Sequence, residues 1–153
     1  MKIEEAMRLA IEVAQDSALN ADEVPVGAVI LNSLGEVIAT GTNEREMHMD
    51  PSGHAEIVAM RRAATSLENW RLDGHTLVVT LEPCAMCAGA IAQSRMEKLV
   101  FGAWDERAGA VGSVWDILRD PRALNKVEVV AGVLAQECAQ MLGNFFQEKR
   151  KGN

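Results

Sequence analysis

Two short segments of this chain carry side chains that a single metal ion can hold together. One contains His54 and Glu56, and the other contains Cys84 and Cys87, directly after Pro83. The histidine and the two cysteines supply three of the four ligands of a tetrahedral zinc. The fourth position is then free for a water, whose pKa zinc lowers toward neutrality. Glu56 is not needed as a ligand and can move protons beside the metal. The pattern predicts hydrolysis at a polar carbon, with nucleobase deamination as the leading interpretation.

Two other interpretations of these residues stay open. A Cys-x-x-Cys pair after a strand is also typical of thioredoxin-like redox sites, but that use leaves His54 and Glu56 without a role. A structural zinc needs a fourth protein ligand, which could come from His48, His75 or Cys138. The two histidines fall in polar, loop-like segments. Cys138 falls on the apolar face of the last predicted helix, as a small core residue does. We favour the catalytic interpretation.

Length and composition indicate one globular domain, residues 1–153. Apolar residues make up 48% of the chain and charged residues 24%, which is typical of such domains. No apolar run reaches the length of a membrane span, and the charged segment 1–14 does not resemble a signal peptide. With three cysteines, two of them assigned to the metal, we expect a reducing cytoplasm.

The net charge of −7 argues against a nucleic-acid partner, but its distribution weakens that argument. Residues 1–75 hold 6 Lys and Arg against 13 Asp and Glu, whereas residues 76–153 hold 9 of each. The chain ends in a basic run, Lys149-Arg150-Lys151. This run either contacts RNA or complements the dipole of its own helix.

The hydrophobic pattern predicts a mixed sheet with helices on its faces. Apolar residues recur at three- and four-residue steps over 3–14, as in an amphipathic helix. The run 76–81 is almost wholly apolar, as in a central strand covered on both faces. Other strands are expected at 26–31, 36–40, 98–101 and 127–130, and other helices at 50–64, 83–92 and 134–149.

Both helices that carry the metal ligands are expected to begin at a proline. Asp50 would cap the first of them with Pro51 in its first turn, and Pro83 would open the second. The ligands would then lie near two helix N-termini, where the helix dipole lowers thiol pKa values. The second helix follows the carboxyl end of a central strand, which is where α/β sheets place ligands.

The same segments resemble the zinc-dependent nucleoside and nucleobase deaminases, which carry His-x-Glu followed by Pro-Cys-x-x-Cys. Over nearly the whole chain the resemblance is closer to the bacterial tRNA adenosine deaminase family. Cytidine, deoxycytidylate and guanine deaminases share the zinc motif, whereas the Gly-Ala-x-Asp loop at 102–105 and the Phe145-Phe146 pair favour the tRNA enzymes. The matching positions are 24–29, 50–51, 54–56, 80–91, 94–95, 101–103, 105, 109–110, 112–113, 145–146 and 149–150.

The resemblance implies a cytidine-deaminase-like, three-layer α/β/α fold with a central mixed five-stranded sheet. It also implies one zinc per subunit and a homodimer. The reaction it implies is hydrolytic conversion of adenosine to inosine at the wobble position of a tRNA anticodon, of the tRNA-Arg type, with Glu56 as the acid–base group.

The resemblance also assigns substrate contacts. It implies that Asn43 hydrogen-bonds the base, that Asp105 contacts a neighbouring ribose, and that Val26 and Ala55 line the base pocket. It further places Phe145-Phe146 near the anticodon loop. The residues alone favour plainer roles: a turn for Asn43, core packing for Val26 and Phe145, and a solvated loop acid for Asp105.

Two rival functions remain. A deaminase of free bases or nucleotides, of the guanine or cytidine type, would use the same zinc and Glu56 but would not need Asp105. A noncatalytic, zinc-stabilised RNA-binding subunit would not need Glu56.

Overall fold

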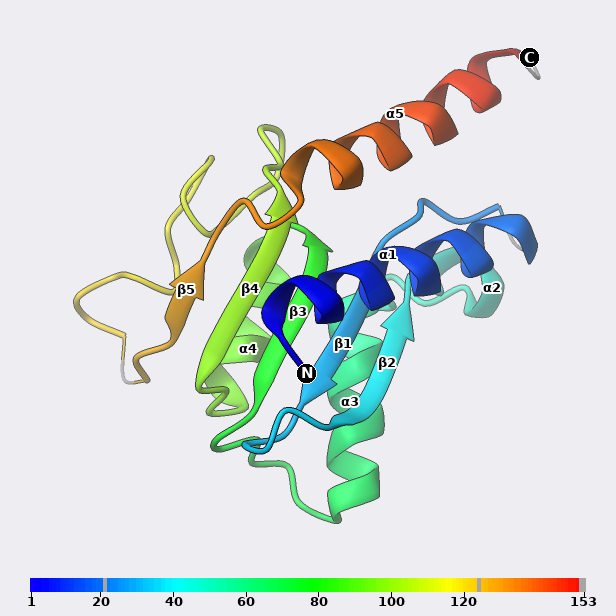
Figure 1. The fold of residues 1–153 in the computed structure, drawn as a ribbon. Coiled ribbons are helices and arrows are strands. Elements are labelled where there is room, and N and C mark those ends of the chain that lie inside the picture. The colour runs from blue at the N-terminus through cyan, green and yellow to red at the C-terminus, as the bar shows by residue number, and fades with distance from the viewer. Residues whose placement is uncertain (21, 124, 152–153) are drawn as a thin grey trace.

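A five-stranded sheet forms the centre of the protein (Figure 1). The computed structural model describes residues 1–20, 22–123 and 125–151. Its elements in chain order are α1 (Ile3–Asn20), β1 (Gly27–Leu31), β2 (Val37–Thr42), α2 (Arg45–His48), α3 (Ala55–Leu67), β3 (Thr76–Leu81), α4 (Ala85–Gln93), β4 (Lys98–Ala103), β5 (Glu128–Val130) and α5 (Ala135–Lys151).

The sheet is mixed, as the sequence predicts. Its strand order is β2-β1-β3-β4-β5. The β1 strand pairs antiparallel with both β2 and β3, whereas β3, β4 and β5 run parallel to one another. The carboxyl ends of β3 and β4 therefore lie at the same edge of the sheet, which is the edge that a following loop and helix can use for a site.

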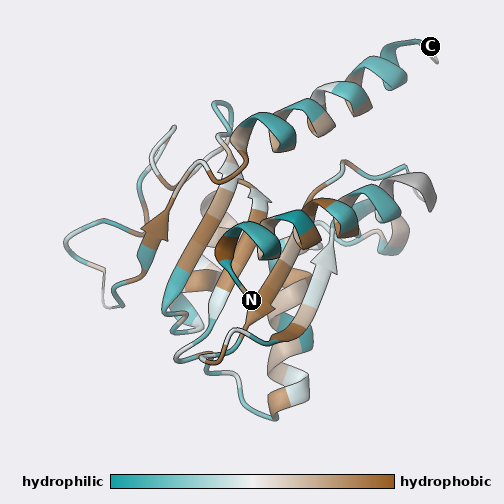
Figure 2. Ribbon diagram, in the orientation of Figure 1, coloured by the Kyte–Doolittle hydropathy of each residue, from teal (hydrophilic) through white to brown (hydrophobic). Residues whose placement is uncertain are grey.

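Alternating side chains of the central strands bury both faces of the sheet. On β3, Leu77 and Val79 pack in the core beneath α3 and α4, whereas Val78 packs in the core beneath α1 and α5. Figure 1 shows these two layers of helices, and Figure 2 shows the hydrophobic residues concentrated on the strands between them. The predicted three-layer α/β/α architecture is confirmed.

The opening helix is amphipathic, as predicted, and extends further than its apolar pattern suggested. Ala6, Met7, Ala10 and Ala14 are fully buried against the sheet. Helix α1 runs to Asn20.

The prediction that the two site helices begin at prolines is wrong. His54 is the N-cap of α3 and Cys84 is the N-cap of α4, so both prolines lie before their helices. The reason at the first helix is local. Asp50 Oδ1 accepts hydrogen bonds from the backbone N–H and the hydroxyl of Ser52, at 2.9 and 2.8 Å. The Asp50 side chain therefore stabilises a turn in place of the first helical turn.

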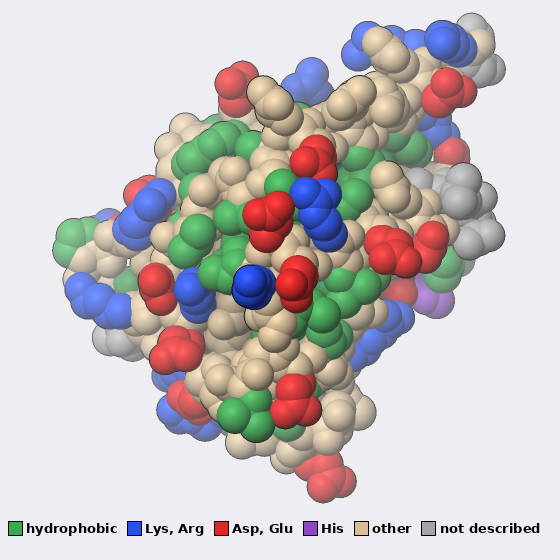
Figure 3. All heavy atoms as spheres, viewed as in Figure 1, with side chains coloured by type: hydrophobic (Ala, Val, Ile, Leu, Met, Phe, Trp, Pro, Cys, Tyr) green, Lys and Arg blue, Asp and Glu red, His purple; other side chains and the backbone are tan. Residues whose placement is uncertain are grey.

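The exposed face that carries α1 and α5 mixes acidic and basic side chains (Figure 3). Basic side chains also gather at the end of α5, where Lys149 pairs with Asp22. In the part of the chain that the structure describes, none of the helices combines the length and hydropathy needed to cross a bilayer. All three cysteines are free.

Close contact between β2 and α3 gives a stability prediction. A Cβ at Gly41 would overlap the backbone of Ala55 and Ala59 in α3. We expect Gly41→Ala to lower the free energy of unfolding by about 1–3 kcal/mol, because the packed helix must shift. Urea denaturation measures this change.

Gly143→Ala is the matched control, because nothing lies near a Cβ at that position of α5. There the same substitution should stabilise the helix by about 0.5–1 kcal/mol. Equal unfolding midpoints for the two variants would contradict the proposed close approach.

Candidate metal centre and pocket

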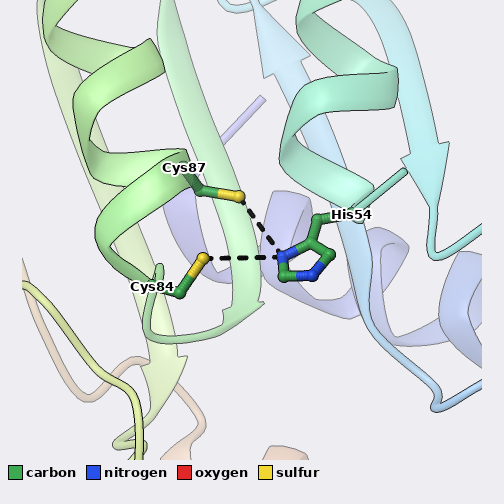
Figure 4. Close-up of side chains that lie close together, drawn as sticks. All are labelled: His54, Cys84 and Cys87. Carbon is green, nitrogen blue, oxygen red and sulfur yellow. Dashed lines mark hydrogen bonds between the residues drawn. The ribbon is translucent and has the colours of Figure 1, made fainter. Parts of the chain in front are cut away.

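Three side chains converge from the N-terminal ends of two helices. His54 precedes α3, Cys84 precedes α4 at the carboxyl end of β3, and Cys87 lies in the first turn of α4. Figure 4 shows the two sulfurs facing the Nδ1 atom of the His54 ring. The ligand atoms of all three residues lie within 4.8 Å of one another.

The spacing of these atoms fits a tetrahedral zinc ion. The Nδ1 atom of His54 lies 3.6 Å from the Cys84 sulfur and 3.5 Å from the Cys87 sulfur. Ordinary zinc–nitrogen and zinc–sulfur bond lengths at a tetrahedral angle separate such ligand atoms by about 3.6 Å. Both nitrogen–sulfur distances therefore match those of a zinc ion held through Nδ1 and two sulfurs.

The two thiols are electrostatically different. The hydrogen bond from Cys87 lowers the pKa of Cys84 to about 3, with a further contribution from His54. The same hydrogen bond and burial raise the pKa of Cys87. The hydrogen bond with Cys84 also raises the pKa of His54. Cys84 is thus ready to bind as a thiolate, and metal binding must release the proton of Cys87.

Glu56 lies beside this group but outside it. It occupies the first turn of α3 and is only 4% exposed. Burial raises the pKa of its carboxyl to about 7. A carboxyl group with a pKa near neutrality can both accept and donate a proton at physiological pH.

A pocket of about 210 Å³ opens at this edge of the sheet. It brings together residues from β3, from the N-terminal ends of α3 and α4, from the segment before β1 and from the loop after β4. The lining residues are Val24, Val26, Asn43, Arg45, His54, Ala55, Glu56, Leu81, Glu82, Cys84, Asp105 and Ala108.

Comparison with known proteins identifies the family. Residues 1–103 match the cytidine and deoxycytidylate deaminase zinc-binding region. The chain belongs to this deaminase family. The tRNA-specific adenosine deaminase of Haemophilus influenzae is 47% identical over 97% of this chain and 85% of its own length. The cofactor of this deaminase is zinc, and His54, Cys84 and Cys87 are positioned to bind it.

Two solved structures are similar to this deaminase. A structure from a study of A-to-I editing by tRNA:A34 deaminases at the wobble position superposes with a TM-score of 0.85 and 39% identity, covering 90% of this chain and 98% of that one. A guanine deaminase from Nitrosomonas europaea superposes with a TM-score of 0.76 and 27% identity, covering 93% of this chain and 83% of that one.

The structure places the other candidate ligands of the deaminase away from the metal group. His48 lies on α2 and faces Glu44, and His75 Nδ1 lies 2.8 Å from the carbonyl of Asp73. Cys138 is buried in the core beneath α1 and α5, as a small core residue. Among the described residues, the group that could hold a metal consists of three side chains, so a fourth coordination position is left for water.

All four predicted substrate contacts line the pocket. Val26 and Ala55 are buried and belong to the core as well. Asn43 follows β2, and its Oδ1 accepts the Arg45 N–H at 3.2 Å, so it forms the predicted turn while facing the pocket. Asp105 Oδ1 accepts two backbone N–H groups of its own loop, and among the described residues none donates to its second oxygen.

Sequence reasoning missed Arg45 and Glu82 as lining residues. Arg45 belongs to α2, which is too short to produce a hydrophobic period. That helix is held by Glu23, a buried carboxylate whose Oε1 accepts the Met47 N–H at 2.6 Å. The sequence could have indicated a special role for Glu82, because an acidic residue at the end of an apolar strand needs buried hydrogen-bond partners.

Residues of α5 do not line the pocket in the part of the chain that the structure describes. Phe145 and Phe146 contact each other edge to face, with ring centroids 5.4 Å apart, and the Phe146 side chain is exposed. Lys149 lies over the Phe145 ring. A role for this tail in RNA binding stays a prediction.

The metal site predicts the outcome of ligand removal. Cys84→Ala should leave less than about a tenth of the wild-type zinc after purification, because two protein ligands hold zinc poorly. Elemental analysis of the dialysed protein measures this loss. Cys138→Ala is the control and should keep its zinc. Full zinc occupancy in Cys84→Ala would refute the assignment.

Proposed function

We propose that this protein is a zinc-dependent hydrolytic deaminase that converts adenosine to inosine at the wobble position of a tRNA anticodon, of the tRNA-Arg type. The observation that carries the proposal is one pocket that holds a three-ligand metal group, a buried carboxyl and two polar side chains suited to a nucleotide. The identity shared with a tRNA-specific adenosine deaminase supports the choice of substrate.

Glu56 moves the protons of this reaction. When bound, zinc supplies a Lewis acid that lowers the pKa of a water in the pocket. The Glu56 carboxylate accepts a proton from the attacking water and passes it to the ring nitrogen beside the carbon that carries the amine. The Glu56 carboxylate then takes the second proton from the newly added hydroxyl group and delivers it to the departing amine. Adenosine and water thereby become inosine and ammonia, with no net change at Glu56.

The other lining residues bind and orient the nucleotide. Val26 and Ala55 provide apolar walls for the flat base, and Asn43 offers an amide to its edge. The second carboxylate oxygen of Asp105, to which no described residue donates, can accept a hydrogen bond from a ribose hydroxyl, which distinguishes RNA from DNA. Arg45 is exposed at the pocket and can contact a phosphate.

An anticodon loop suits this pocket. Its bases are not paired, so extruding one of them costs little, and the enzyme can read its face and edge.

We also propose that residues 1–153 act as one domain, that the protein works in the cytoplasm, and that two copies associate. The apolar outer side of α4, where Met86 is 40% exposed, supports association of copies.

The proton-transfer role predicts that Glu56→Gln lowers kcat by about 10²–10⁴-fold. The amide keeps the shape of the side chain but cannot accept the proton. The substrate is an arginine anticodon stem-loop with adenosine at the wobble position, and mass spectrometry detects inosine. Zinc content should stay at the wild-type level. Activity within a few-fold of wild type would rule out this mechanism.

The substrate assignment predicts deamination of that single adenosine and no turnover of guanine or cytidine. Asp105→Ala should raise KM for the stem-loop by about tenfold, the value of one hydrogen bond to a charged group. Steady-state kinetics measure this effect. Turnover of free guanine or cytidine, with the stem-loop untouched, would replace the proposal with a free-base deaminase.

A further inference from the structure

The loop that carries Asp105 has little regular structure of its own. It follows β4 and runs beside the segment that leads into Cys84. Gly109 forms an isolated bridge with Cys84, and the Ala110 N–H donates to the Pro83 carbonyl at 2.8 Å. A loop of this kind needs an internal anchor if its side chains are to hold one position in the pocket.

The Glu82 carboxylate is that anchor. Its Oε1 accepts the backbone N–H of Asp105 at 3.0 Å, together with the hydroxyl of Ser113. Its Oε2 accepts the backbone N–H groups of Val111 and Ser113, at 2.9 and 3.1 Å. One side chain therefore ties both ends of the loop, residues 105–113, to the segment that precedes Cys84.

The hydrogen-bonding capacity of this carboxylate is used up within the protein. A carboxylate offers about four acceptor sites, and four donors from the loop occupy them. Glu82 is only 2% exposed. Gly109 packs directly on the carboxylate, and a Cβ at this position would overlap it. Although Glu82 lines the pocket, no acceptor site is left for a substrate.

We infer that Glu82 is a positioning residue, which sets the affinity for RNA by holding the Asp105 loop against the pocket. Glu82 acts through the backbone of Asp105 and does not touch the substrate. The four hydrogen bonds of the Glu82 carboxylate go to Asp105, Val111 and Ser113 and not to a zinc ligand or Glu56, so we expect their loss to change RNA affinity more than the chemical step. The inference rests on the proposed function, because Asp105 is the proposed ribose contact.

Glu82→Gln tests the inference by replacing one acceptor oxygen with an NH₂ donor. The Ser113 hydroxyl can turn and accept from that NH₂, whereas backbone N–H groups cannot. We therefore expect the NH₂ to lie at the Oε1 position, where it expels the Asp105 N–H. KM for the stem-loop should rise about tenfold, with kcat within about twofold and zinc content unchanged.

A double-mutant cycle separates positioning from general stabilisation. If Glu82 acts through Asp105, the pair Glu82→Gln and Asp105→Ala should have the KM of Asp105→Ala alone. Multiplied KM effects would overturn the inference, as would an unchanged KM in Glu82→Gln. A collapse of kcat at constant KM would also overturn it, because Glu82 would then act in the chemistry.

Ser113→Ala keeps the inference testable if Glu82→Gln does not fold. It removes the hydroxyl donor and leaves the three backbone donors, so KM should rise by a smaller factor and again not multiply with Asp105→Ala. An unchanged KM would count against the anchor. Wild-type turnover of the stem-loop is measured first. Its absence refutes the proposed function, whereas turnover with unchanged KM in the variants refutes only the inference.

Discussion

The active pocket depends on two helix N-termini that meet at one edge of the sheet. The backbone amides at the start of α3 and α4 carry partial positive charge, which favours thiolates and a proton-accepting carboxylate nearby. The sheet supplies the meeting point, because β3 ends directly before Cys84 and the Gly41 contact brings α3 close against β2. The spacing of His54 from the two sulfurs, which matches that of zinc ligands, follows from this packing.

Two buried glutamates at the pocket illustrate how environment decides the role of one residue type. Burial raises the pKa of Glu56 to about 7, which suits a group that must gain and lose a proton. Burial acts in the same direction on Glu82. The hydrogen bonds from Ser113 and from three backbone N–H groups outweigh it, and the pKa of Glu82 falls below its ordinary value. Glu82 therefore stays ionised and serves as a fixed acceptor.

The structure is similar both to a guanine deaminase and to a structure from a study of tRNA:A34 deaminases, which indicates that one fold can present the same metal chemistry to different substrates. In the proposed function, the metal group and Glu56 supply chemistry that suits any aminated ring. In the proposed function, substrate choice then depends on the surrounding loops that line the pocket, here the turn that carries Asn43 and Arg45 and the loop that carries Asp105. These loops lack a repeating hydrophobic pattern, so their conformation depends on individual hydrogen bonds such as those of Glu23 and Glu82.

The sequence by itself determined the secondary-structure pattern, the mixed sheet and the residues of the metal group, because hydrophobic period and ligand spacing are local properties. It misplaced the starts of α3 and α4; at α3 the reason is that the Asp50 side chain stabilises a turn that a cap-and-proline pattern does not reveal. Only the tertiary structure decided that Arg45 and Glu82 face the pocket. Their positions depend on contacts between segments far apart in the chain, and no local pattern encodes such contacts.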